Sequence, residues 1–123
     1  MRNPLYQSPD RSYVNAGVCA RRSGDTAGAR GYFLLALKAR PTQPQALYQM
    51  ADLSYAHGGY DEAKDYLARL TKAAQLGPEA LWLGVRIERK LGDRNIEESY
   101  ATQLRRNFPN SRETRALLSG QQE

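Results

Sequence analysis

The chain has 123 residues and a formal net charge of +5, and hydrophobic side chains make up 41% of it. That is enough for one domain, and a mean hydropathy of −0.71 favours amphipathic elements that each bury one face. No apolar run reaches the roughly 18 residues of a membrane span. The first residues also lack the apolar stretch of a secretory signal, so the sequence as written is not expected to be exported or anchored.

The positive charge comes mainly from arginines that are scattered along the chain. Only Arg21–Arg22 and Arg105–Arg106 are adjacent pairs, and neither forms a polybasic run. We therefore expect an ordinary solvated surface, without nucleic-acid binding. An anionic lipid or nucleic-acid partner is an alternative that rests on the net charge alone, and binding that survives high salt would argue against a purely electrostatic mode.

The chain begins with a lead-in segment, residues 1–8, in which Leu5 and Tyr6 are expected to cover the end of the first helix pair. Ser8, Pro9 and Asp10 then supply an N-cap, a proline at the first helical position and an acid in the first turn. The sequence therefore predicts a helix that starts there and continues to residue 22.

A second helix is predicted over residues 26–39, after the turn around Gly24 and before Pro41. Residues 44–70 read as a helix, a two-glycine turn and another helix of matching length. A third pair starts at Pro78, turns near Gly92 and ends before Pro109. A short helix over 112–118 and a frayed tail over 119–123 complete the chain.

These landmarks recur at a fixed interval. Gly24, Gly58 and Gly92 lie 34 residues apart, and so do Pro44 and Pro78. A helix-turn-helix unit that repeats every 34 residues is the tetratricopeptide repeat signature. The sequence therefore predicts an all-α tetratricopeptide solenoid over residues 9–118. It has three repeats, at about 10–43, 44–77 and 78–111, and a capping helix over 112–118 because the last repeat would otherwise leave one face bare.

Small residues recur where the two helices of a pair should approach each other. We expect Gly17 to face Ala29 and Ala51 to face Ala63, with large side chains filling the space against the next pair. In the third repeat Glu97 replaces the small residue, so this repeat matches the pattern least well. Terminal repeats are commonly atypical.

The sequence offers no catalytic or metal-binding constellation. His57 is the only histidine, at the end of a predicted helix, where an imidazole suits the C-terminal carbonyl groups. Cys19 is the only cysteine and is expected to be a small buried hydrophobe. The two fall at different repeat positions, so a nucleophile and base pair is not expected. We predict no enzyme, no metal site and no cofactor.

The candidate site is the concave face, which the first helix of each repeat lines. Its predicted residues combine tyrosines and the single tryptophan with arginines, the types that dominate binding hot spots. Tyr48 and Tyr55 are expected to be exposed there, while Trp82 either lines the groove or packs between repeats. Val14 and Val18 occupy the positions where chaperone-binding repeats clamp a carboxylate, so that specific role is not expected. The predicted partner-binding residues are Arg21, Tyr48, Asp52, Tyr55, Trp82, Arg86 and Arg89.

Longer segments carry a more specific resemblance. They read QALYQMADLSYAHGGYDEAKDYLARL and ALWLGVRIERKLGDRNIEESYATQLRRNFPNSRE, after an NPLY lead-in. They resemble the C-terminal half of the type IV pilus biogenesis and stability family, PilF/PilW. The resemblance implies a non-enzymatic protein on the periplasmic face of the outer membrane, anchored by an N-terminal lipid, that helps the pilus secretin assemble.

The sequence departs from this family because it has neither a signal peptide nor a lipid-attachment cysteine. We therefore expect a fragment of a larger protein, with the lipid anchor outside this chain. The alternative is a cytosolic adaptor that binds a peptide of an unrelated partner in its concave groove. The coding sequence upstream of Met1 discriminates between the two.

Overall fold

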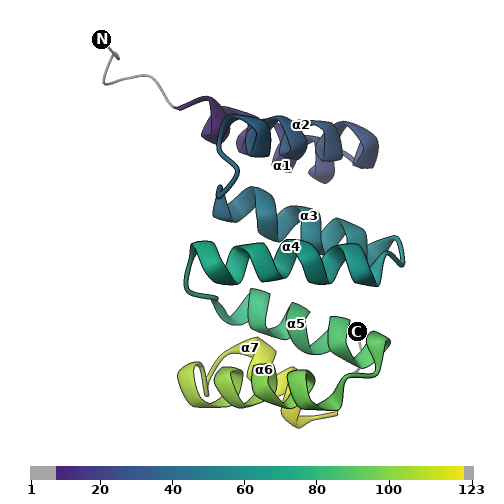
Figure 1. Ribbon diagram of the computed structural model, residues 1–123, viewed down its shortest axis with the longest axis vertical. Coiled ribbons are helices and arrows are strands. Elements are labelled where there is room, and N and C mark those ends of the chain that lie inside the picture. The colour runs from purple at the N-terminus through teal and green to yellow at the C-terminus, as the bar shows by residue number, and fades with distance from the viewer. Residues whose placement is uncertain (1–7, 121–123) are drawn as a thin grey trace.

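The structure is a computed structural model that describes residues 8–120. Within that range the regular elements are helices, stacked as successive antiparallel pairs (Figure 1). The predictions for the lead-in segment, including Leu5 and Tyr6, and for residues 121–123 lie outside the described residues. The helices are α1 (Pro9–Arg22), α2 (Thr26–Ala39), α3 (Pro44–Ala56), α4 (Tyr60–Ala73), α5 (Pro78–Leu91), α6 (Arg94–Asn107) and α7 (Arg112–Leu118).

The stacking confirms the predicted all-α solenoid. The helices α1 and α2, α3 and α4, and α5 and α6 pack most extensively within their pairs, and α2 packs on α3 as α4 packs on α5. The short helix α7 lies against α5 and α6, which is the place predicted for the capping helix. The assignment of residues 9–118 to one domain stays a prediction.

The turn inside each pair depends on a glycine. Gly24, Gly58 and Gly92 have φ angles of +85°, +83° and +82°, in the left-handed region that other residues rarely adopt. Each helix pair therefore reverses direction at the same point of the 34-residue repeat. His57 is the C-cap of α3, at the helix end where the sequence placed it.

The core runs continuously through the stack. Its largest fully buried side chains include Phe33, Leu47, Met50 and Leu67. The Phe33 ring packs directly on Gly17, since a Cβ atom on Gly17 would lie 2.5 Å from Phe33 Cε1. The glycine therefore makes room for an aromatic ring at the α1–α2 contact. That Gly17 also faces Ala29 stays a prediction.

The prediction for Cys19 is wrong. Its side chain is exposed on α1, because it lies two positions after the buried Gly17 and so on the opposite side of the helix. A small apolar side chain in mid-helix carries no information about which side of the helix will be covered. Only the packing of the neighbouring helices decides that.

The buried Asp10 is an anchor that sequence reasoning did not identify. Its carboxylate accepts a hydrogen bond from Gln43 Nε2 at 2.7 Å, and Arg40 Nη1 lies 3.9 Å away. A hydrogen bond from Ser8 lowers the pKa of Asp10 below its ordinary value, Gln43 and Arg40 act in the same direction, and burial opposes them. This network joins the start of α1 to the connection before α3.

Two acids of the third pair, unusual for a repeat core, are both paired. Glu88 is 1% exposed, and its Oε1 lies 3.3 Å from Lys64 Nζ on the preceding pair. Glu97 Oε2 accepts from Arg89 Nε at 2.8 Å. Ion pairs thus replace the small and aromatic contacts of the other repeats, since a buried charge needs a partner.

A tyrosine occupies the same repeat position in α2, α4 and α6, but its burial differs between the three helices. Tyr66 of α4 and Tyr100 of α6 are half-buried against the core. Tyr32, at the same position of α2, is 40% exposed, and its neighbour Leu35 is 42% exposed. The outer face of α2 therefore exposes a tyrosine at a position that is half-buried in α4 and α6.

Candidate partner-binding surface

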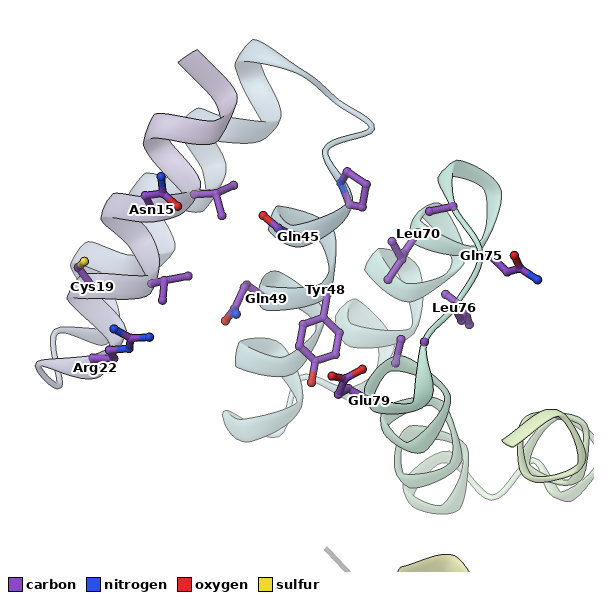
Figure 2. A pocket seen from close by; sticks show the side chains of 16 residues that line it. Asn15, Cys19, Arg22, Gln45, Tyr48, Gln49, Leu70, Gln75, Leu76 and Glu79 are labelled. Carbon is purple, nitrogen blue, oxygen red and sulfur yellow. The ribbon is translucent and has the colours of Figure 1, made fainter. Parts of the chain in front are cut away.

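An open groove with a volume of about 670 Å³ lies between α1 and α3 and reaches the start of α5 (Figure 2). The α4–α5 connection closes one side of it. The lining residues are Val14, Asn15, Val18, Cys19 and Arg22 of α1, Pro44, Gln45, Tyr48 and Gln49 of α3, Leu70 of α4, residues 74–77, and Glu79 and Ala80 of α5.

The groove is open because the first repeat has short side chains on its concave face. Val14 and Val18 lie at the repeat positions that Tyr48 and Asp52 occupy in the second repeat. The valines contribute apolar wall without reaching across the space. The result is a concave, largely uncharged surface of the size and shape that suits a peptide or small ligand.

Tyr48 is the side chain that reaches into this groove from α3. Figure 2 shows it beside Glu79 of α5, between the walls formed by α1 and by the α4–α5 connection. Burial raises the pKa of Tyr48 to about 12, with a further contribution from Asp52, while Arg86 acts in the opposite direction. The phenol is therefore neutral at physiological pH and can act as a hydrogen-bond donor toward a ligand.

A second cluster, which we call the arginine–aromatic stack, consists of Tyr55, Trp82, Arg86 and Arg89. The Arg86 guanidinium carbon lies 5.2 Å from the Tyr55 ring centre and 5.7 Å from that of Trp82. Arg89 lies 5.5 Å from the Trp82 ring centre. These distances are within the range of cation–π attraction. The stack connects the last turns of α3 to the middle of α5.

Arg21 and Asp52 join the first two repeats across the concave face. The Arg21 guanidinium donates to Asp52 Oδ2 at 2.6 Å from Nη2 and to Gln49 Oε1 at 2.6 Å from Nη1. The two charged side chains retain 32% and 23% exposure, so solvent screens the pair. The contact orients Arg21 rather than adding much stability.

The structure therefore divides the predicted site. Tyr48 lines the groove, Arg21 and Asp52 form an ion pair at its side, and the other four residues form the arginine–aromatic stack. The expected exposure of Tyr55 is wrong, because it is 8% exposed and packs on Tyr60 with ring centres 5.3 Å apart. Trp82 is half-buried beneath two arginines, which partly answers the question that the sequence left open.

Sequence reasoning missed one wall of the groove. Leu70 belongs to a second helix of a pair, and residues 74–77 connect two pairs, so neither lies at a helix position expected to face the concave side. Gln49 was also missed, although it accepts a hydrogen bond from Arg21. The apolar Leu76 in the connection before Pro78 was the available signal.

Among residues 8–120, no group of three or more histidine, cysteine, aspartate or glutamate side chains is placed to hold a metal ion. In the same range, no helix combines the length and the apolar character needed to cross a bilayer.

Comparison with known proteins shows a sequence similarity to a pilus assembly protein. The chain is 31% identical over 109 residues to the type IV pilus assembly protein PilF of Pseudomonas aeruginosa. The alignment covers 89% of this chain and 43% of that protein. The chain thus spans less than half the length of the curated relative that it matches.

Two solved structures share the fold. The first, described as a functional characterisation of Pseudomonas aeruginosa PilF, has a TM-score of 0.85 and 28% identity, over 98% of this chain and 54% of that one. The second is PilW, described as a widely conserved type IV pilus biogenesis factor, with a TM-score of 0.78 and 29% identity, over 94% and 53% of the two chains.

A family model described as tetratricopeptide repeat matches residues 20–83, which is more than half of the chain. The match includes most of the first two helix pairs and the start of the third. Together with the left-handed glycine turns every 34 residues, this shows that the chain belongs to the tetratricopeptide repeat family.

Proposed function

We propose that this chain is part of a non-enzymatic scaffold for type IV pilus biogenesis, which assists assembly or stability of the outer-membrane secretin through protein contacts. The observation that carries the proposal is the similarity to PilF, which extends over 89% of this chain. Its relatives are named for pilus assembly and pilus biogenesis. The proposed location is the periplasmic face of the outer membrane.

The concave surface supports a role in protein binding. It combines an open groove with tyrosine, tryptophan and arginine side chains, which are common at the centres of protein interfaces. Repeat solenoids use such concave surfaces to bind extended segments of other proteins. The proposed partner is the secretin or another component of the pilus machinery, and no nucleic acid is proposed.

The test is a gene deletion in the bacterium that encodes the chain. We expect the deletion to reduce both surface pili and secretin multimers, measured by electron microscopy and by immunoblotting of unheated outer membranes. The full-length gene should restore both. A copy with Ala63→Arg should not, because Ala63 is fully buried in α4, whereas Ala68→Arg on the exposed side of the same helix should restore them.

Two results would contradict the proposal. The first is a deletion strain with unchanged pili and unchanged secretin multimers. The second is a co-purification with the full-length protein, from piliated cells, that recovers neither the secretin nor any other pilus component.

The second candidate is a cytosolic adaptor that binds a peptide of an unrelated partner. The groove favours peptide binding in either compartment, so it supports both candidates. Cell fractionation separates them, because recovery of the full-length protein in the outer membrane supports the pilus role and recovery in the cytosol supports the adaptor. The coding sequence upstream of Met1 gives the same distinction.

A further inference from the structure

Arg86 differs from the other arginines of the concave face in how its charge is balanced. It lies between the rings of Tyr55 and Trp82, at 5.2 Å and 5.7 Å from their centres. Its Nε is buried and has no hydrogen-bond acceptor. Within residues 8–120, no carboxylate lies close enough to form an ion pair with Arg86.

The neighbouring arginines at related positions are paired. Arg21 is bonded to Asp52 at 2.6 Å, and Arg89 is bonded to Glu97 at 2.8 Å. Both of those carboxylates are therefore engaged by other guanidinium groups. Arg86 is held by aromatic faces alone, among the described residues of this surface.

Aromatic rings fix a guanidinium in place and remove water from its faces, but they do not neutralise its charge. A partly dehydrated, pre-oriented arginine binds a carboxylate strongly, because its planar donors match the two oxygens and little side-chain freedom remains to be lost. We infer that Arg86 receives a glutamate or aspartate side chain from an acidic segment of a protein partner. This inference names the partner chemistry of the proposed scaffold and rests on that proposed function.

The groove indicates which kind of side chain lies next to the acidic one in the partner segment. Tyr48 lines the groove, and its phenol is influenced by Arg86, so the two features adjoin on the concave face. The groove walls include the apolar Val14, Val18 and Leu70. The matching segment carries an apolar side chain for the groove and an acidic one for Arg86, and the net charge of +5 favours its approach.

The test measures binding of two labelled peptides to the 123-residue chain by fluorescence anisotropy. One contains leucine, serine and glutamate, and the other has glutamine in place of each glutamate. Both are amidated at the C-terminus, so that only the side chains differ in charge. We expect the glutamate peptide to bind about tenfold more tightly, as a charge-assisted hydrogen-bonded contact implies.

Variants assign the effect to Arg86. Arg86→Gln should remove the preference for glutamate, and Arg86→Lys should restore only part of it, since lysine lacks the planar donor arrangement. Arg105→Gln is the control with the same charge change, because Arg105 lies on α6 and pairs with Glu98. Circular dichroism spectra that match the original chain are required of each variant.

Three results would overturn the inference: equal binding of the two peptides, no binding of either, or an unchanged preference in Arg86→Gln. A peptide that binds only with a free C-terminal carboxylate would also overturn it. If Arg86→Gln loses the preference while a deletion strain keeps its pili, the proposed function fails and this inference stands. If the preference for glutamate is absent while the deletion removes pili, this inference fails and the proposed function stands.

Discussion

The first and third repeats use the same two concave positions in opposite ways. Val14 and Val18 of the first repeat leave an open groove, whereas Trp82 and Arg86 of the third fill their surface with stacked planar side chains. The backbone is the same helix in both cases. Side-chain length at two repeat positions therefore decides whether the solenoid presents a hollow or a pre-oriented charge.

The difference assigns separate tasks to the two regions. The groove between α1 and α3 offers apolar wall to a ligand, and the arginine–aromatic stack offers a cation. Both regions use α3, which contributes Tyr48 to the groove and Tyr55 to the stack. A segment of a partner that engages both would be recognised by shape at one end and by charge at the other.

The largest effect is expected from Ala63→Arg, which removes the support shared by both regions. Ala63 is fully buried in α4, behind α3. An arginine there must bury an unpaired charge in a packed core, so we expect a loss of about 4 kcal/mol and of cooperative unfolding. Thermal unfolding followed by circular dichroism measures it. Ala68→Arg, exposed on the same helix, is the control, and a nearly unchanged melting curve for Ala63→Arg would show that the 34-residue register is misplaced.

The next effect concerns the groove alone. Val18→Phe should fill part of the groove and weaken binding of the glutamate peptide about tenfold, with a change of less than about 1 kcal/mol in the free energy of unfolding. Anisotropy and chemical denaturation measure the two quantities. Ser12→Phe, on the exposed side of α1 and outside the groove, should leave binding unchanged. Equal affinities for all three proteins would show that the groove is not used.

A smaller effect is expected from the Arg21–Asp52 ion pair, which borders the groove. A double-mutant cycle with Arg21→Ala and Asp52→Ala should give a coupling energy of no more than about 1 kcal/mol, because both side chains are partly exposed. The coupling, obtained from urea unfolding, should fall as salt is added. A large, salt-independent coupling would contradict the description of this pair as solvent-screened.

The smallest effect at neutral pH is expected from Tyr48→Phe, within about 0.5 kcal/mol in the free energy of unfolding. Its signature appears at alkaline pH. Burial raises the pKa of Tyr48 from 10.0 to about 12, so the folded chain holds a proton that the unfolded chain has released. The contribution is fully present below pH 10 and is lost as the pH rises toward 12.

The original chain should therefore lose more stability than Tyr48→Phe between pH 10 and 12, as measured by urea unfolding. Burial also raises the pKa of Tyr100, but that residue is present in both proteins and cancels in the comparison. Parallel stability curves for the two proteins over this interval would show that Tyr48 is not buried as described.

Most of the fold could be predicted from residues with local physical effects. Glycine at a left-handed turn and proline in the first turn of a helix act within a few residues, so α1, α2 and α7 begin and end at the predicted residues. The candidate site could be predicted less completely from the sequence. Repeat position indicated which helices face the concave side, but not that Tyr55 would be covered by Tyr60 or that Cys19 would lie exposed.

What the sequence determined by itself is the succession of helices and their 34-residue period, because turn chemistry and helix periodicity are local properties of the chain. The tertiary structure alone decided which charges meet. Asp10 with Gln43, Lys64 with Glu88, and Arg86 with Tyr55 are contacts between different helices or across connections. The two residues of these contacts lie 24 to 33 positions apart in the sequence, and only the stacking of one pair on the next brings them within reach.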